Sequence, residues 1–197
     1  MKSAVHRHLT VLALLGALLG GLVLAGCGEE GNEPSPGPNY EKALAGAPPR
    51  LAKLYDQANE LLPGGLDAFD ERVQTDLAGY PAVVNIWASW CGPCRAEFPH
   101  FQQVSARMGK KLAFLRVNSA DNSDAAKTFL STHPVPYPSY EDPDKDIAQS
   151  LGATHGLPGT AFFNADGELT YTRSGPYSSD QELEADVQKY AIEGQSG

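Results

Sequence analysis

The chain has few basic residues and few cysteines. Its 197 residues include 15 Lys and Arg against 24 Asp and Glu, and only three Cys. Proteins that bind nucleic acids need clustered Lys and Arg to contact phosphates, so this balance argues against a nucleic-acid partner. The acidic charge is more simply explained by solubility. There is no internal repeat, and no apolar run after the first one is long enough to span a membrane.

The one long apolar run, residues 9–25, follows Lys2 and Arg7 at the very start of the chain, before any acidic residue. A positive start followed by a short apolar core is typical of an export signal. The alternative interpretation is an uncleaved helical anchor. We favour the signal, because small residues directly before Cys27 suit a cleavage site.

The end of this segment, Leu24-Ala25-Gly26-Cys27, resembles the lipobox of bacterial lipoproteins, in which the cysteine becomes a lipidated N-terminus. An acylated Cys27 with more than one chain would hold the protein on a membrane. We therefore expect residues 1–26 to be a lipoprotein signal peptide. The mature protein is expected outside the cytoplasm, lipid-anchored to the bacterial cell membrane.

This expectation also settles the number of free thiols. An exported chain with three cysteines would leave one unpaired. If Cys27 carries lipid, only Cys91 and Cys94 remain, and they can pair with each other. Outside the cytosol nothing keeps a dithiol reduced by default, so this pair can switch between two states.

The rest of the chain reads as a tether and one domain. Residues 27–39 are expected to be the lipidated cysteine and a flexible tether, since GEEGNEPSPGPN cannot build a core. Residues 40–197 fit a single domain. Removing Lys2 and Arg7 with the signal leaves a net charge of −11.

Hydrophobic periodicity and turn residues predict the elements of this domain. Because strands and helices alternate before a hairpin and a last helix, we expect an α/β fold with a mixed central β-sheet flanked by helices. The segment 133–140 carries three prolines and is not expected to be a central strand. The predicted elements are a helix over 50–62, a buried strand over 82–89, a helix from the cysteines to about Met108 with Gly109 as its stop, a strand over 111–118, a helix over 123–132 opened by Ser123, a helix over 142–152, hairpin strands over 160–164 and 168–174, and a helix over 179–190 with Ser179 and Glu182 as a capping box.

The stretch WCGPC, residues 90–94, carries the chemistry. A thiolate, not a thiol, attacks a disulfide. Cys91 is expected at the start of a helix, next to free backbone donors and the positive end of the helix dipole. Pro93 suits the first turn, where its missing N–H is no loss. Cys94 lies one turn inside and should stay protonated longer, so we expect Cys91 to attack and Cys94 to resolve.

Other interpretations of C-x-x-C are weaker. Structural zinc would need four ligands, and only the scattered His100, His133 and His155 remain to help. Haem attachment would need His after the second cysteine, where Arg95 stands instead. A purely structural disulfide closing so small a loop would constrain the unfolded chain little. We expect redox catalysis without a metal or another cofactor.

The segment NIWASWCGPCRAEFP resembles the active-site segment of the thioredoxin superfamily, and more narrowly of the TlpA/ResA-like extracytoplasmic thiol-disulfide oxidoreductases. The resemblance covers most of residues 65–193. It rests also on Glu97 with Phe98-Pro99 and on Asn85, which stands where cytosolic thioredoxins carry a buried acid. Leu157-Pro158 falls where the superfamily has its cis-proline. The resemblance implies a thioredoxin-like fold.

The resemblance also suggests roles for individual residues. A cis Pro158 would turn the Leu157 backbone toward the sulfurs, where a substrate strand can pair with it, whereas an ordinary trans turn proline is the alternative. Trp90, with Gly92 and Pro93, is expected to flank the sulfurs, and Trp87 to pack in the core.

Glu97 lies one turn after Cys94. Its carboxylate would raise the thiol pKa and, when protonated, could shuttle a proton, whereas a solvated helix carboxylate is the alternative.

The chain departs from the pattern in two places. Relatives often carry Pro-Thr where this chain has Pro158-Gly159, with Thr160 one place later. The β-hairpin that usually precedes the first core strand is weak between residues 67 and 77, and a helix over 50–62 is the candidate to replace or extend it. Both differences bear on the substrate more than on the chemistry.

Gly-Pro between the cysteines is the dipeptide of thioredoxin, a reductant, and Glu97 would oppose the thiolate that strong oxidants stabilise. We therefore expect a reductase of exported protein disulfides, supplied by a membrane electron donor and, by family analogy, acting on apocytochrome c. The positive charge of Arg95 would instead stabilise the thiolate. A disulfide-forming oxidase or isomerase that passes electrons to a membrane acceptor is therefore the close alternative. A thiol peroxidase and a non-catalytic binding lipoprotein are the others.

Overall fold

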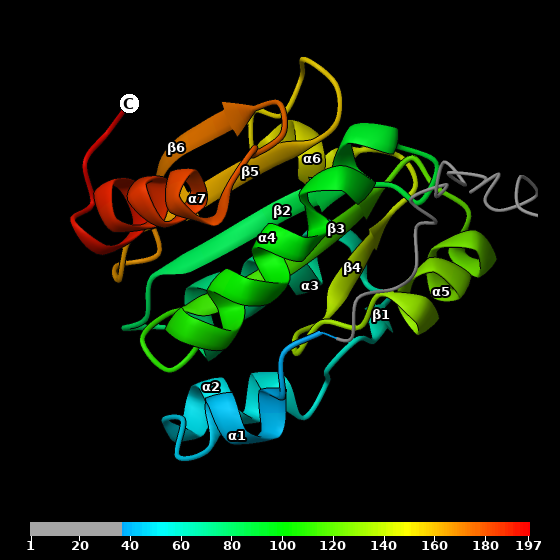
Figure 1. Ribbon diagram of the computed structural model, residues 1–197. Coiled ribbons are helices and arrows are strands. Elements are labelled where there is room, and N and C mark those ends of the chain that lie inside the picture. The colour runs from blue at the N-terminus through cyan, green and yellow to red at the C-terminus, as the bar shows by residue number, and fades with distance from the viewer. Residues whose placement is uncertain (1–36) are drawn as a thin grey trace, which may run out of the picture. The chain divides into compact units, whose positions relative to one another are not determined.

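A computed structural model describes residues 37–197, which form a six-stranded sheet with helices packed against it (Figure 1). The order of the strands across the sheet is β1-β4-β3-β2-β5-β6. The pairs β1–β4, β4–β3 and β3–β2 are parallel, whereas β5 is antiparallel to both β2 and β6. The mixed sheet predicted from the sequence is confirmed. The strands are β1 (Leu61–Leu62), β2 (Ala82–Trp87), β3 (Ala113–Ser119), β4 (Ser139–Asp142), β5 (Gly159–Phe163) and β6 (Leu169–Ser174).

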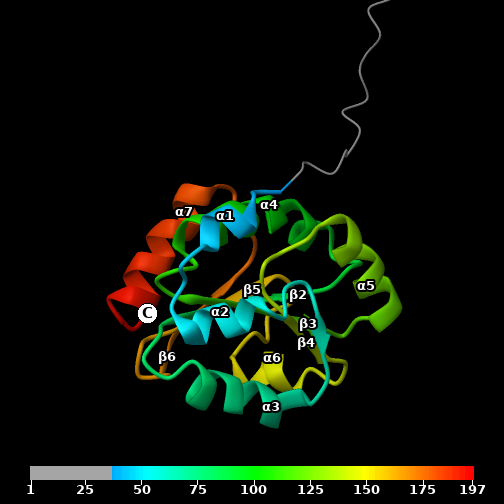
Figure 2. The same ribbon diagram turned by 90° about the horizontal axis from the view of Figure 1, so that it is seen from below.

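The helices cover both faces of this sheet. Figure 2 shows α4 and α7 on one side and α3 and α6 on the other. None of the helices within residues 37–197 combines the length and apolar character that a membrane crossing requires. The helices are α1 (Tyr40–Leu44), α2 (Pro49–Tyr55), α3 (Gly65–Glu71), α4 (Gly92–Met108), α5 (Ser123–Thr132), α6 (Asp146–Ser150) and α7 (Asp180–Asp186), with π-helical segments η1 (Arg72–Asp76) and η2 (Val187–Ile192) continuing α3 and α7.

Strand β2 lies at the centre of the sheet and is buried along its whole length, as its apolar run predicts. Successive side chains of a strand point to opposite faces. Val83 and Trp87 accordingly join a hydrophobic cluster with Phe98 of α4, while Val84 and Ile86 join a second cluster on the other face. Asn85 lies on the same face as Val83 and Trp87, so the one polar residue of β2 is directed toward α4.

The helix predicted over 50–62 is wrong beyond Tyr55. Leu51 and Leu54 are buried on α2 as the helical spacing requires, but the chain then turns and pairs Leu61 with Ser139 in β1. Asn59 adopts a left-handed conformation with φ 62°, which asparagine tolerates better than most residues and which ends helical geometry. Its side chain donates to the Leu130 carbonyl over 2.9 Å, and this bond anchors the turn.

The weak hairpin between residues 67 and 77 is helical in the structure, as α3 and η1. Phe69, Val73 and Leu77 are buried and recur every four residues, which places them on one face of a helix. This periodicity was present in the sequence. Residues 65–76 therefore replace the expected hairpin, and a helix over 50–62 does not.

Two expectations around the prolines and the 142–152 helix need correction. Strand β4 begins immediately after Pro138 and lies one strand in from the sheet edge, so the last two residues of the 133–140 segment are in a strand. The Pro138 carbonyl accepts from the Arg116 backbone N–H at 3.1 Å, a bond that needs no proline N–H. Helix α6 covers only Asp146–Ser150, because Asp142 belongs to β4. The Asp142 carboxylate accepts from the N–H groups of Ile147 and Ala148 and so caps the start of α6.

The remaining predicted elements are confirmed, with differences of one or two residues at their ends and with different capping contacts at two helices. Helix α4 ends at Met108, with Gly109 as its C-cap. Ser179 is the N-cap of α7, but the Glu182 carboxylate accepts from the Ser178 N–H rather than from that of Ser179. Helix α5 starts at Ser123, yet its N-cap is Asn122, whose Oδ1 accepts from the N–H groups of Asp124 and Ala125 at 3.0 and 3.1 Å.

Because Asn122 caps α5, the substitution Asn122→Ala should lower the free energy of unfolding by about 1 kcal/mol, whereas Asn122→Gly should lower it by only a few tenths. Urea unfolding followed by circular dichroism measures both. Ser123→Ala is the matched control, since Ser123 donates only to the Glu141 carboxylate. A larger loss for Ser123→Ala than for Asn122→Ala would contradict this assignment of the cap.

Candidate functional site

The two cysteines lie where β2 passes into α4, as the sequence predicts. Cys91 is the N-cap of α4 and forms a disulfide with Cys94, their Cα atoms being 5.3 Å apart. Cys91 is 4% exposed and Cys94 is fully buried. The Cys94 backbone N–H donates to the Cys91 sulfur over 3.2 Å. In the reduced state this donor and the helix dipole would favour a negative charge on Cys91 over one on Cys94.

Trp90 directly precedes Cys91, and Leu157 packs against the hydrophobic cluster that contains both cysteines. The Trp90 side chain is 64% exposed, and its indole N–H donates to the Ala120 carbonyl over 3.0 Å. The Leu157–Pro158 peptide bond is cis, as expected, and Trp87 is buried in the core. A cavity of about 590 Å³ opens between Trp90, Ala120 and Leu157. Gly92 and Pro93 form the exposed first turn of α4.

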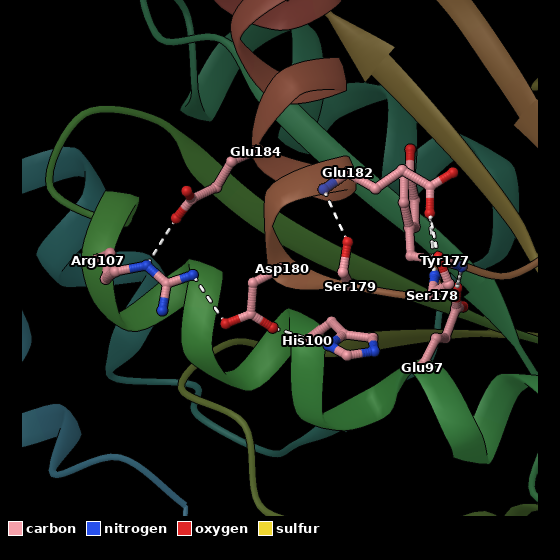
Figure 3. Close-up of polar contacts among 9 residues, drawn as sticks. All are labelled: Glu97, His100, Arg107, Tyr177, Ser178, Ser179, Asp180, Glu182 and Glu184. Atoms are coloured by element: carbon pink, nitrogen blue, oxygen red, sulfur yellow. Dashed lines mark hydrogen bonds and ion pairs between the residues drawn. The ribbon is translucent and has the colours of Figure 1, made fainter.

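Glu97 is not a solvated helix carboxylate, because its side chain has no exposed surface. Its Oε1 accepts from the Asn85 side-chain amide at 2.8 Å. Its Oε2 accepts from the Tyr177 backbone N–H at 3.0 Å (Figure 3). Burial raises the pKa of Glu97 to about 7, against the lowering effect of these two hydrogen bonds and of the charges on Arg116 and Arg173. Glu97 therefore exists in both protonation states near neutral pH.

Arg116 is part of this site, although the sequence analysis did not select it. It is the central residue of β3 and is fully buried. Its guanidinium lies 3.3 Å from the centroid of the Phe98 ring and donates from Nη2 to Asn85 Oδ1 over 3.0 Å. An arginine inside the apolar run KLAFLRVN was the available signal, since arginine is almost never fully buried without a partner.

Asp121 was also missed, and it joins the ends of β2 and β3. Its carboxylate accepts from the Ser89 hydroxyl and from the Asn118 side-chain amide, each at 2.8 Å, and from the Ser89 backbone N–H. Burial would raise the pKa of Asp121, but these hydrogen bonds outweigh it and lower the pKa. Because Ser89 immediately precedes Trp90 and Cys91, the carboxylate fixes the approach of the chain to the disulfide.

Ion pairs hold helix α7 against α4, at positions of α4 that follow Glu97. Figure 3 shows Asp180 between His100 and Arg107 of α4. The Asp180 carboxylate accepts from His100 Nδ1 at 2.7 Å and from Arg107 at 3.0 Å, and Arg107 also pairs with Glu184 at 2.6 Å. These contacts dock the segment that presents the Tyr177 N–H to Glu97.

The histidines considered for zinc are separate in the structure. His100 pairs with Asp180, and His133 stacks on Phe129 with ring centroids 4.2 Å apart. Within residues 37–197, no group of three or more His, Cys, Asp and Glu side chains lies close enough to hold a metal ion. Cys27, the predicted lipidation site, and most of the predicted tether lie outside the described residues.

Comparisons with known proteins agree with this geometry. Residues 70–188 match the protein family described as Redoxin. The chain is 31% identical over 186 residues to the thiol:disulfide interchange protein DsbE of Escherichia coli K12, an alignment covering 92% of this chain and 91% of that one. It is 26% identical over 111 residues to the thiol-disulfide oxidoreductase ResA of Bacillus subtilis, covering 55% of this chain and 62% of the relative.

A solved structure resembles the fold as well. The crystal structure of a secreted Mycobacterium tuberculosis disulfide oxidoreductase homologous to E. coli DsbE superposes with a TM-score of 0.52 and 26% identity, covering 60% of this chain and 97% of that one. The thioredoxin-like fold and the resemblance to extracytoplasmic thiol-disulfide oxidoreductases are thereby confirmed.

The raised pKa of Glu97 predicts a specific dependence of stability on pH. An unfolded glutamate loses its proton near its ordinary pKa of 4.5, whereas the folded protein keeps it up to about pH 7. Between these values the unfolded state binds fewer protons, so the free energy of unfolding falls as the pH rises. Glu97→Gln removes this effect. Between about pH 4.5 and pH 8, the free energy of unfolding of the variant should therefore rise relative to that of wild type. The expected rise is on the order of 3 kcal/mol, at about 1.4 kcal/mol per pKa unit.

Urea unfolding of both oxidised proteins at the two pH values measures the gain. Glu60→Gln, which removes an exposed carboxylate, is the control and should show no such gain. A stability difference between wild type and Glu97→Gln that is the same at both pH values would contradict the assignment.

Proposed function

Since the chain belongs to the Redoxin family and is a thiol-disulfide oxidoreductase, we propose that Cys91 is its attacking thiolate and Cys94 its resolving thiol. The observation that supports this most directly is the position of Cys91 at the N-cap of α4, with a backbone donor 3.2 Å from its sulfur. Cys94 lies one turn inside the helix and is fully buried. A buried thiol is harder to ionise, so the two sulfurs differ in the way that the two roles require.

The proposed reaction transfers two electrons from the dithiol to a substrate disulfide. The Cys91 thiolate attacks one substrate sulfur, the substrate S–S bond breaks, and the leaving thiolate takes up a proton. The Cys94 thiol then loses its proton and attacks the Cys91 sulfur. The mixed disulfide breaks, the second substrate sulfur leaves as a thiolate that takes up a proton, and the Cys91–Cys94 disulfide seen in the structure remains.

We assign Glu97 to the proton that Cys94 must lose in this second step. Glu97 follows Cys94 by three residues on the same helix, and its pKa of about 7 lets it accept and release a proton near neutral pH. A carboxylate in water would be too weak a base, whereas burial among the donors of Asn85 and Tyr177 keeps this one poised. The role of Glu97 thus depends on the burial that the structure shows.

Reduction is the direction that we propose. Gly92-Pro93 is the dipeptide of a reducing thioredoxin, and the Glu97 carboxylate opposes excess stabilisation of the thiolate, which is how strong oxidants act. Arg95, the cation that pulled the other way, is exposed and lies over the Phe129 ring, with its guanidinium carbon 5.7 Å from the centroid. A solvated charge affects a neighbouring thiol weakly.

The proposed substrates are disulfides of exported proteins, among them the cysteines of apocytochrome c. Electrons would come from a membrane donor, and Trp90 with the Leu157-Pro158 backbone would bind the substrate chain. Lipid on Cys27 would keep the enzyme on the outer side of the bacterial cell membrane. The relatives' name, thiol:disulfide interchange protein, supports the type of substrate.

Substitution of the resolving cysteine should trap the substrates. In Cys94→Ser, the mixed disulfide on Cys91 cannot be resolved, so exported proteins should accumulate as adducts that dithiothreitol releases. Non-reducing gels and mass spectrometry of the adducts measure this, with Cys91→Ser as the matched control that captures nothing. Adducts on Cys91→Ser instead of Cys94→Ser would reverse the two roles.

The direction of electron flow follows from the reduction potential. We expect equilibration with glutathione or dithiothreitol buffers to give a value well below about −150 mV, in the range of reducing thioredoxins rather than of strong oxidants. Mass spectrometry of alkylated cysteines gives the reduced fraction at each buffer potential. A value near or above about −150 mV would favour the oxidase or isomerase.

A further inference from the structure

Arg116 is a fully buried cation that has no role in the reaction proposed above. It stands opposite Asn85 in the parallel pairing of β3 with β2, so the two side chains share one face of the sheet. Phe98 and Trp87 surround its guanidinium, at 3.3 and 5.2 Å from their ring centroids. Burying a charge is strongly unfavourable unless it is hydrogen-bonded and compensated. Its retention at the centre of a strand therefore needs an explanation.

Arg116 settles the orientation of the Asn85 amide. A guanidinium has only donors, so the group that it contacts must be an acceptor. Nη2 of Arg116 lies 3.0 Å from Asn85 Oδ1, which leaves the Asn85 NH₂ group directed to Glu97 Oε1 at 2.8 Å. With the amide reversed, two donors would face each other at Arg116. The order of donors and acceptors from Arg116 through Asn85 to Glu97 thus has one direction.

Asn85 connects the charged groups of Arg116 and Glu97, which do not contact each other. Among the described residues, Arg116 makes no direct ion pair within 4.0 Å, and two of its nitrogens, Nε and Nη1, have no hydrogen-bond partner in the protein. The nearest link to a carboxylate runs through Asn85. When Glu97 is ionised, the buried cluster is neutral overall. When Glu97 is protonated, the cluster carries a single positive charge.

The other groups that face Glu97 cannot take over this role. Tyr177 contributes a backbone N–H from the loop before α7, and its hydroxyl is turned to Asp186. Arg173 of β6 lowers the pKa of Glu97, but it is already paired with Glu182 and Asp186. Tyr137 is also buried, and burial raises its pKa to about 12, so it is uncharged near neutral pH. The buried cation available to Glu97 is Arg116.

We propose that Arg116 is a positioning residue that acts through Asn85 to hold the Glu97 carboxyl in place and to compensate the charge of its ionised form. This inference rests on the proposed proton-handling role of Glu97. The buried cluster of Arg116, Asn85 and Glu97 then carries no net negative charge while Cys91 forms its thiolate. Arg116 thereby reduces, without abolishing, the repulsion that the Glu97 carboxylate exerts on the attacking thiolate.

The test is a titration of the Glu97 carboxyl by carbon-detected NMR in the oxidised protein, where neither cysteine ionises. Arg116→Met removes the charge and the donor, and we expect the Glu97 midpoint to rise by about one pH unit, about a tenfold change in proton affinity. Arg116→Lys, which keeps the charge, should bring the midpoint back toward that of wild type. Arg50→Met, which removes an exposed arginine of α2, is the control. An unchanged midpoint in a folded Arg116→Met protein would overturn the proposal.

A measurement on the wild type decides the question if Arg116→Met does not fold. The Arg116 guanidinium and Asn85 amide resonances should shift with the same midpoint as the Glu97 carboxyl, because protonation alters every bond of the cluster. Resonances that stay constant through that midpoint would overturn the coupling.

Exchange of the reduced wild type with a small disulfide tests the proposed function separately. Absence of exchange would remove the function and leave the titration to decide whether Arg116 positions Glu97. In active protein, Arg116→Met should move the pH profile of exchange upward together with the Glu97 midpoint. A profile that stays in place while the midpoint moves would remove the link to catalysis.

Discussion

The burial of the Glu97 carboxyl is the constraint on which the site depends. A carboxyl without solvent contact must find hydrogen-bond donors in the protein, and here they come from parts of the chain far apart in sequence. Asn85 approaches from β2 and Tyr177 from the loop before α7. The requirement therefore fixes α4 against the sheet on one side and the C-terminal helix on the other. The cysteines, three and six residues earlier on the chain, are positioned by the same contacts.

The sequence was most informative where local rules and tertiary packing agree. The run AVVNIW is buried on both faces of the sheet, and α4 has its proline in the first turn and its glycine just past the end. Each rule alone therefore gave the right element. The segment around Asn59 shows the opposite case, in which the local pattern and the tertiary structure disagree. Helical spacing continued through Leu61 and Leu62, but the pairing of Leu61 with Ser139 depends on a contact 78 residues away in the chain. Local periodicity cannot register such a contact.

The candidate site was predictable in its sulfur chemistry and not in its electrostatics. The spacing of Cys91 and Cys94 identifies a dithiol at a helix start whatever the rest of the fold does. By contrast, Glu97 could equally have faced solvent, since α4 has both buried and exposed positions in that turn. Arg116 became part of the site only because β3 lies beside β2 with Arg116 opposite Asn85, a register that emerges from the assembled sheet. Asp121 is a similar case at the strand ends.

The indole of Trp90 is unusual in being both largely exposed and tied to a backbone carbonyl, that of Ala120. Ala120 itself has φ 52°, a conformation that residues other than glycine rarely adopt. A flat ring already held in place loses little freedom when another molecule lies against it, so docking is favoured without many new bonds. In the proposed role at the substrate chain, such a surface would receive unrelated sequences in turn and release each of them quickly.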